Sequence, residues 1–209
     1  MKAVPSALGQ SSFIRTIRPR QVLSFGPDED PISLESLNVL IGPNAGGKSN
    51  LIDVIGLLRA APQDLAEPIR QGGGIADWLW KGAAGTPKAE VEITVSNPHH
   101  GGMPLRHRVA FTMVSQRFEL VDEVIENERP YQGQSDKYFY YRYQGGRPVL
   151  NVRERKTDGA GAGGSITREL RREDLVPDQS VLSQRKDPDQ YPEITYLGRQ
   201  YARVRLYRE

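Results

Sequence analysis

The fold of this chain is decided by the stretch Leu37-Asn38-Val39-Leu40-Ile41-Gly42-Pro43-Asn44-Ala45-Gly46-Gly47-Lys48-Ser49-Asn50. Residues 37–41 are apolar and β-prone apart from Asn38, which is typical of a strand that is covered on both faces. A glycine-rich loop follows and ends on Lys48-Ser49, where an amphipathic segment predicts a helix that runs to about residue 60. Strand, G-x-x-x-x-G-K-S loop and helix, in that order, predict a loop that binds the phosphates of a nucleoside triphosphate.

The residue types in this loop suit a highly charged ligand. Glycines let the backbone turn tightly and bring its N–H groups close to the phosphates, and the N-terminus of the helix adds a positive dipole end. Lys48 is expected to reach the β- and γ-phosphates, and Ser49 to hold Mg²⁺ through its hydroxyl. We therefore expect ATP and Mg²⁺ as cofactors, bound by Gly42, Pro43, Asn44, Ala45, Gly46, Gly47, Lys48, Ser49 and Asn50.

Composition limits the other classes of function. The 209 residues are 37% hydrophobic and 26% charged, which suits a globular fold. The chain has no cysteine, which excludes disulfides, thiolate metal sites and cysteine nucleophiles. No apolar run is long enough for a signal peptide or a membrane span, so we expect a cytoplasmic protein without a membrane partner. The net charge of +2 does not by itself indicate nucleic acid binding.

The remainder of the chain changes from helical to alternating periodicity near residue 89. Before that point we expect a short strand at 32–34, a helical stretch at 63–70 and a helical turn at 75–82, in which the two tryptophans pack against the sheet. After it we expect an antiparallel meander with a tight turn at Gly145-Gly146, and its strands are Glu90–Val95, Arg108–Val114, Phe118–Ile125, Lys137–Gln144 and Pro148–Arg153.

The last segments are more irregular. A Gly/Ala-rich loop at 158–164 is followed by a helix at 193–202 and a β-like end at 204–207. The fold class we expect is α/β with α+β character, in which a strand, a phosphate loop and a helix precede an antiparallel meander. The chain then divides into a phosphate-loop core (12–88), a β subdomain (89–155) and a loop, helix and closing strand (156–209).

The motif and its flanks resemble the RecF/SMC-type ATPases, which are ABC-like and AAA-labelled and act in DNA repair, chromosome maintenance and bacterial defence. The resemblance rests on Ile32-Ser33-Leu34 and on residues 37–52, with Pro-Asn after the first glycine and Ser-Asn after the lysine. The segments 74–82 and 187–192 resemble a subgroup of bacterial ATPases. The resemblance implies an N-terminal lobe of an ABC-type ATP-binding domain, with ATP held at a dimer interface.

In that family a signature motif and an acidic strand complete the ATPase, and each has one superficial match in this chain. Leu23-Ser24-Phe25-Gly26 matches the signature letters, but it runs into a Pro/Asp turn where no helix can begin. Asp122-Glu123 ends a β-prone run, but Glu119 would place a charge in a strand that must be buried. The resemblance also implies a glutamine that senses Mg²⁺ and water after the meander, for which Gln184 is the weak candidate and Gln179 the alternative.

These observations imply an ATPase that this chain does not complete alone. The expected partners are a C-terminal ATPase lobe or a second polypeptide, a second copy in an ATP-dependent homodimer, and DNA. The alternatives are a non-hydrolysing module that uses ATP only for dimerisation, and a fragment of an ABC transporter ATPase. His99, His100 and His107 lie in or beside a turn without a carboxylate spaced for a metal site. The aromatic run Tyr138–Tyr143 predicts a strand packed on both faces.

Overall fold

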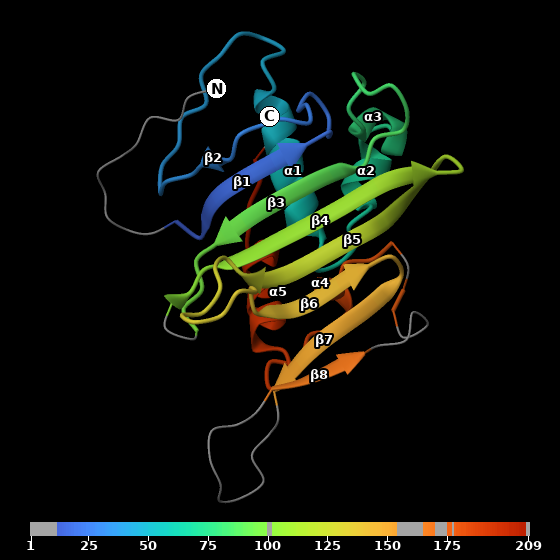
Figure 1. Ribbon diagram of the computed structural model, residues 1–209. Coiled ribbons are helices and arrows are strands. Elements are labelled where there is room, and N and C mark those ends of the chain that lie inside the picture. The colour runs from blue at the N-terminus through green and yellow to red at the C-terminus, as the bar shows by residue number, and fades with distance from the viewer. Residues whose placement is uncertain (1–11, 100–101, 154–164, 170–174, 177, 208–209) are drawn as a thin grey trace, which may run out of the picture.

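A computed structural model describes residues 12–99, 102–153, 165–169, 175–176 and 178–207. Its described part forms one eight-stranded sheet in which all neighbouring strands are antiparallel (Figure 1). From one edge to the other the order is β2 (Ile32–Ser33), β1 (Ile14–Arg20), β3 (Ala89–Val95), β4 (Leu105–Val114), β5 (Arg117–Asn127), β6 (Phe139–Gln144), β7 (Arg147–Arg153) and β8 (Ser165–Glu169). This architecture confirms the mixed helix-and-sheet class and the meander.

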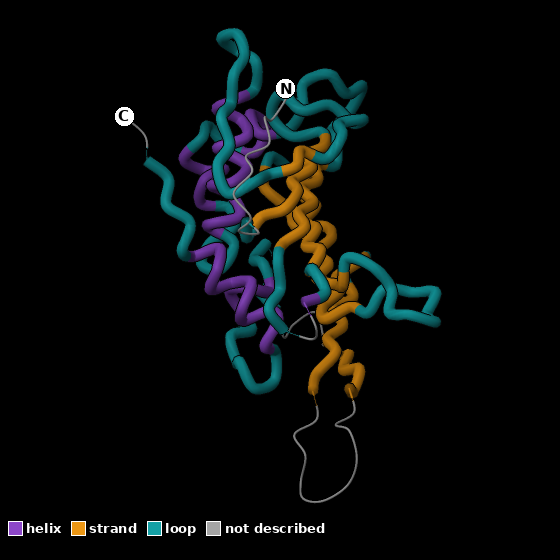
Figure 2. Tube along the Cα trace, turned by 90° about the vertical axis from the view of Figure 1, so that its left-hand side faces the viewer, coloured by secondary structure: helices purple, strands orange, loops and turns teal. Residues whose placement is uncertain are grey.

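The described helices lie on one face of the sheet, as the side view shows (Figure 2). They are α1 (Lys48–Ala60), α2 (Glu67–Gln71), α3 (Ile75–Trp78), α4 (Val181–Gln184) and α5 (Pro192–Ala202). The core between the two layers is built from the apolar faces of both, with Leu51, Val54 and Leu57 from α1 against Ile17, Val91 and Ile93 from the strands. The alternation of the strands therefore places one set of side chains in this core and the other on the open face.

The open face of the sheet carries charged side chains that pair across the strands. Arg108 binds Asp122 at 2.9 Å, and Arg106 binds Glu126 at 2.6 Å and also Glu92. Burial acts to raise the pKa of Glu92, but the hydrogen bond and charge of Arg106 outweigh it, and the pKa lies below its usual value. The paired side chains shield one another from solvent. For this reason even the acidic side chains of β5 on the open face are buried.

The short connections of the meander follow from their sequence. Gly145 and Gly146 both have positive φ, of 56° and 80°, as a two-residue hairpin of the type I′ class requires. The corresponding turn between β4 and β5 is made by Ser115 and Gln116, which adopt the same left-handed region without a glycine. The helix predicted from residue 48 and the one predicted at 193–202 are also confirmed, with α5 beginning one residue earlier at Pro192.

The predicted central strand at 37–41 is wrong for the described part of the chain. These residues have no strand assignment, and Leu37, Val39 and Ile41 are 63%, 55% and 73% exposed. After β2 the chain leaves the sheet at a turn in which the Asn38 side chain bonds both the N–H and the C=O of Glu35. A β-strand needs a neighbouring strand to pair with its backbone N–H and C=O groups, and no described segment is paired with residues 37–41.

Three further differences lie near the end of the chain. Residues 204–207 are not a strand, and β8 and α4 were not predicted. The predicted loop at 158–164 lies outside the described residues. Helix α4 is only one turn long, so it carries no helical periodicity that a sequence could reveal.

Among the described residues, no helix has the length and apolar character that a membrane crossing requires.

Candidate functional site

The loop at residues 42–47 has the backbone of an anion-binding nest. Ala45 and Gly47 both lie in the left-handed region, with φ of 63° and 80°, and the Gly46 N–H donates to the Pro43 carbonyl at 3.1 Å. Alternating backbone handedness of this kind turns successive N–H groups toward one concave side. A Cβ at Gly46 would lie 3.0 Å from that same carbonyl, so the tight turn requires glycine there.

Lys48 ties the two ends of this loop together. Its Nζ atom donates to the carbonyl oxygens of Gly42 and Pro43, at 2.8 and 2.6 Å. The ammonium group therefore lies over the loop rather than in bulk solvent. A phosphate seated on the loop would meet this charge together with the backbone N–H groups.

The first turn of α1 is open to a ligand. Gly47 is the N-cap residue, no side chain caps the helix, and its first turn contains no acidic residue. The first N–H groups of a helix have no intrahelical acceptor, so they remain available together with the positive end of the helix dipole. The side chain of Ser49 is exposed at this end. Loop, lysine and helix N-terminus thus converge on one small volume, which is suited to a polyphosphate.

A cavity of about 650 Å³ adjoins the phosphate loop. One wall is the loop itself at Ala45, Gly46 and Gly47, and the other is the segment 24–33, which includes the carboxylates of Asp28, Glu29 and Asp30. Ser24 stands where the walls meet, because its Oγ lies 3.0 Å from the position that a Cβ on Gly47 would take. This neighbourhood was not predicted, because the signature-like letters at residues 23–26 were set aside for lack of a following helix and residues 27–33 match no phosphate-binding pattern.

The segment beside the cavity is held by the turn that carries the tryptophans. The Leu23 N–H donates to the Trp78 carbonyl at 2.7 Å, and the Trp80 N–H donates to the Gln21 carbonyl at 3.0 Å. Gln21 and Leu23 both have positive φ, of 50° and 53°, which marks a tight loop. Trp78 is buried in the core, as predicted for the pair, whereas Trp80 is half-buried and lies against Gly26.

Residues 23–26 form a turn and not a helix start, as their sequence context predicts. The Phe25 N–H donates to the Val22 carbonyl at 2.9 Å, and Phe25 is buried. This segment therefore offers no helix N-terminus to a phosphate. It does, however, pack against the phosphate loop of its own chain.

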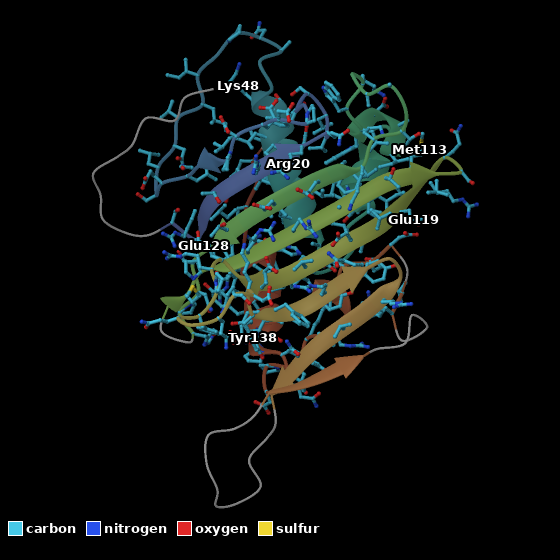
Figure 3. All side chains as sticks on the ribbon, viewed as in Figure 1. Arg20, Lys48, Met113, Glu119, Glu128 and Tyr138 are labelled. Atoms are coloured by element: carbon cyan, nitrogen blue, oxygen red, sulfur yellow. The ribbon has the colours of Figure 1, made fainter. Side chains whose placement is uncertain are left out.

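The structure does not bring Gln184 or Gln179 to the phosphate loop. Gln184 is used within its own segment, where its side chain accepts from the Val176 N–H at 2.6 Å and donates to the Gln179 carbonyl at 3.0 Å. Gln179 donates to Asp64 at 3.2 Å, beyond the C-terminal end of α1. A helix of 13 residues is roughly 20 Å long, so both glutamines lie at the opposite end of α1 from Lys48. Figure 3 shows Lys48 at one extremity of the molecule.

A second polar cluster lies in the core, far from the loop. The Glu123 carboxylate accepts from the Ser180 hydroxyl and from the Val181 N–H, the latter at 2.8 Å. His107 Nε2 lies 3.2 Å from the same carboxylate, and its Nδ1 lies 3.1 Å from the Tyr201 hydroxyl. The expectation that His107 lies in or beside a turn is therefore wrong, because it is fully buried in β4.

Burial and the charge of Glu123 raise the pKa of Tyr201 well above its ordinary value, so its hydroxyl stays protonated. We assign the Tyr201 hydroxyl as donor to Nδ1 and the Nε2–H as donor to Glu123. Among the described residues no group of three or more histidines and acids is arranged to hold a metal ion. This cluster joins α4 and α5 to the sheet, and Glu123 does not line the cavity beside the phosphate loop.

Comparison with known proteins is consistent with the prediction of a phosphate-binding loop. Residues 37–112 match the family described as "AAA domain, putative AbiEii toxin, Type IV TA system". The match begins at the apolar segment before the loop and extends through α1 to β4. It supports an AAA-type, P-loop ATPase-like domain that binds nucleotide. No curated protein matches the chain.

Proposed function

We propose that this chain is the Mg-ATP-binding part of an ATPase of the RecF/SMC type. The observation that carries the proposal is the convergence of Lys48 Nζ, the nest at 42–47 and the uncapped start of α1. In this proposal the loop binds the β- and γ-phosphates, and the nucleoside extends into the cavity beside residues 24–33. A volume of about 650 Å³ lies in the range of small-molecule sites.

Titration calorimetry of the chain with ATP and Mg²⁺ tests this proposal. We expect saturable binding to one site per chain. If no saturable binding is detected up to millimolar ATP, the proposal is wrong, because a phosphate loop that is already formed should bind ATP without a folding step.

The magnesium role is tested at Ser49. The Ser49→Ala chain is expected to lose most of the gain in ATP affinity that Mg²⁺ gives the native chain, because the hydroxyl is the proposed metal ligand. The exposed Ser36 supplies the matched control, since Ser36→Ala removes the same atom outside the phosphate loop. Titrations with and without Mg²⁺ measure the effect, and an equal Mg²⁺ dependence in native and Ser49→Ala chains would contradict the assignment.

We further propose that strands from a C-terminal lobe or a second polypeptide pair with residues 37–41. The support is the state of this segment: the apolar side chains of Leu37, Val39 and Ile41 are exposed, and residues 37–41 make no backbone hydrogen bonds to the described sheet. Free N–H and C=O groups on both edges make a segment a template for neighbouring strands. Because the segment runs directly into Gly42, such strands would also fix the approach to the phosphate loop.

Because residues 37–41 are not paired with another strand, substitutions in this segment are expected to have little effect on the stability of the chain. Val39→Thr and Ile41→Thr are each expected to change the free energy of unfolding by less than about 0.5 kcal/mol, as for surface sites. Ile93→Thr, at a buried position of β3, is the control and is expected to cost about 2 kcal/mol or more. Urea unfolding measures all three, and a loss at Val39 as large as at Ile93 would show that the segment is a buried strand of this chain.

A non-hydrolysing nucleotide-dependent interaction module is the second candidate. It is favoured by the lining of the cavity, where the carboxylates of Asp28, Glu29 and Asp30 belong to a loop and none ends a buried strand. Steady-state ATP turnover by the chain separates the two functions. Turnover above background supports an ATPase complete in this chain, whereas binding without turnover supports the module or the need for a further lobe.

A further inference from the structure

Two cavities share the turn at residues 21–26 as part of their walls. Ser24 and Phe25 line the cavity beside the phosphate loop. Leu23 lines a second cavity, a groove of about 880 Å³ whose other walls include Trp78 and residues of α1 and α2. The turn follows β1 and lies between the start of α1 and α3 (Figure 1). Adjacent residues of one turn therefore face two different spaces.

The backbone of this turn is strained at two residues that are not glycine. Gln21 and Leu23 have φ of 50° and 53°, in the left-handed region. Such a conformation persists only where neighbouring contacts hold it, and it is common at ligand clamps and switch segments. Here the Gln21 N–H donates to the Gly26 carbonyl at 3.0 Å, and the Phe25 N–H donates to the Val22 carbonyl at 2.9 Å. A turn held in this way can relax when one of its contacts is exchanged.

Ser24 is the residue of the turn that faces the phosphate loop. Its Oγ lies 3.0 Å from the position that a Cβ on Gly47 would take, and the Phe25 ring lies 4.0 Å from the same position. The side chain of Ser24 is exposed, and its hydroxyl has no hydrogen-bond partner among the described residues. A phosphate seated on the loop would lie beside Gly47, so this hydroxyl can donate to it without first losing another bond.

The closing contact of the turn carries a negative charge that a nucleotide would repel. Glu29 Oε1 accepts from the Gly26 N–H at 3.0 Å, and Glu29 lines the cavity beside the phosphate loop. Phosphates on the loop would therefore face this carboxylate as like charges. A bound nucleotide attracts the Ser24 hydroxyl and repels the Glu29 side chain. It thus has different affinities for two arrangements of the turn, which is the condition for shifting one toward the other.

The same turn is joined to the segment that carries the tryptophans. The Leu23 N–H donates to the Trp78 carbonyl at 2.7 Å, and Leu23 and Trp78 line the groove together. The Trp80 ring lies 3.8 Å from the position that a Cβ on Gly26 would take. A movement of residues 23–26 therefore changes the wall of the groove and the surroundings of the Trp80 ring.

We propose that Ser24 is a phosphate-binding residue of the nucleotide site, and that the turn at residues 21–26 couples this site to the groove. The inference rests on the proposed nucleotide site and adds to it one binding residue and a second cavity that responds. Nucleotide on the loop draws the Ser24 hydroxyl toward the phosphates and weakens the bond between Glu29 and Gly26. Leu23, which is adjacent to Ser24 in the chain, then shifts in the wall of the groove.

Tryptophan fluorescence during a titration with Mg-ATP tests the coupling. We expect a saturable change in the native chain, with the same Kd as calorimetry gives, because both methods report one binding event. Trp80→Phe removes the ring beside Gly26 and is expected to lose most of this change. Magnesium tripolyphosphate should reproduce the change, because the phosphates and not the base move the turn. An equal response to adenosine alone would overturn the assignment.

Substitutions at Ser24 test the phosphate contact. Ser24→Ala is expected to lower the affinity for Mg-ATP about tenfold, as for the loss of one hydrogen bond to a charged group. It should also lose most of the fluorescence change at saturating ATP. Ser24→Thr keeps the hydroxyl and should restore both, which a purely structural role would not predict. Ser36→Ala is the control, because this serine is exposed outside the cavity. Equal behaviour of Ser24→Ala and Ser36→Ala would overturn the role of Ser24.

The groove is observed through a single introduced cysteine, because the chain has none of its own. Gln71→Cys places an environment-sensitive dye on the exposed lining of the groove, and Gln132→Cys places it in an exposed loop that lines neither cavity. We expect Mg-ATP to change the dye signal at residue 71 and not at residue 132.

Calorimetry on the same samples separates this inference from the proposed function. If ATP binds but neither the tryptophans nor the dye at residue 71 respond, the coupling is wrong and the nucleotide site stands. If ATP does not bind, the nucleotide site and the coupling are both wrong.

Discussion

Replacement of Lys48 by alanine is expected to lower the affinity for ATP by at least about 100-fold while the domain stays folded. Each charge-assisted hydrogen bond is worth about 1.5–3 kcal/mol, so the loss of two from the ammonium group to phosphate oxygens gives this factor. Within the described part of the chain, Nζ is hydrogen-bonded to the exposed carbonyls of Gly42 and Pro43. Solvent can take its place there, so the free energy of unfolding should change by less than about 1 kcal/mol.

Lys81 is the matched control for this experiment. It is an exposed lysine, it pairs with Asp77 at 3.4 Å, and it does not line the cavity beside the phosphate loop. Calorimetry with Mg-ATP on Lys48→Ala and Lys81→Ala separates a phosphate contact from the loss of a surface charge. An unchanged affinity of Lys48→Ala for Mg-ATP would contradict the assignment of residues 42–49 as the nucleotide site.

The second large effect is expected at Glu123, where replacement by methionine should cost about 3–5 kcal/mol of folding free energy. Methionine has a similar length and no strong acceptor, so the Ser180 hydroxyl, the Val181 N–H and the His107 ring would lose their shared partner. An unsatisfied buried donor costs about 1–3 kcal/mol. A typical domain has only about 5–15 kcal/mol in total, so this loss would leave it close to unfolding.

Glu119 offers a control in the same strand. Glu119→Met makes the same replacement at a half-exposed position, and should shift the free energy of unfolding by less than about 1 kcal/mol. Glu123→Gln should lie between the two, since the amide keeps one acceptor oxygen and replaces the other with a donor NH2 group. Urea unfolding of the three variants measures these differences. An equal loss of stability in Glu119→Met and Glu123→Met would refute the role of the buried carboxylate.

Glu123 shows what the sequence could and could not predict about a buried acid. Its position at the end of a β-prone run made it a candidate for the acidic strand of the ATPase, and the charge of Glu119 in that run argued against this role. The structure places its carboxylate in the core as the common acceptor of three elements. The alternation predicted a half-exposed strand, but residues 122–127 are all buried because the ion pairs of the open face cover it.

Features that depend on neighbours in sequence were predicted well. The hairpin at Gly145-Gly146 needs positive φ at two adjacent residues, and the helix after Ser49 needs only an apolar face that repeats. The segment 37–41 shows the limit, because its apolar run predicts a strand but does not supply the strands that would pair with it. Gln184 shows another limit, because its place after the meander gives no information on which end of α1 it faces.

The sequence by itself therefore determined the phosphate loop, the helix that follows it and the antiparallel meander, since each rests on local backbone preference or on the period of apolar residues. Only the tertiary structure decided that Ser24 and residues 28–30 face the loop, and that His107, Glu123, Ser180 and Tyr201 share one buried network. These contacts join residues far apart in the chain, and their geometry is set by how the layers pack. For the loop at 42–49, the sequence specified the chemistry and the packing specified what surrounds it.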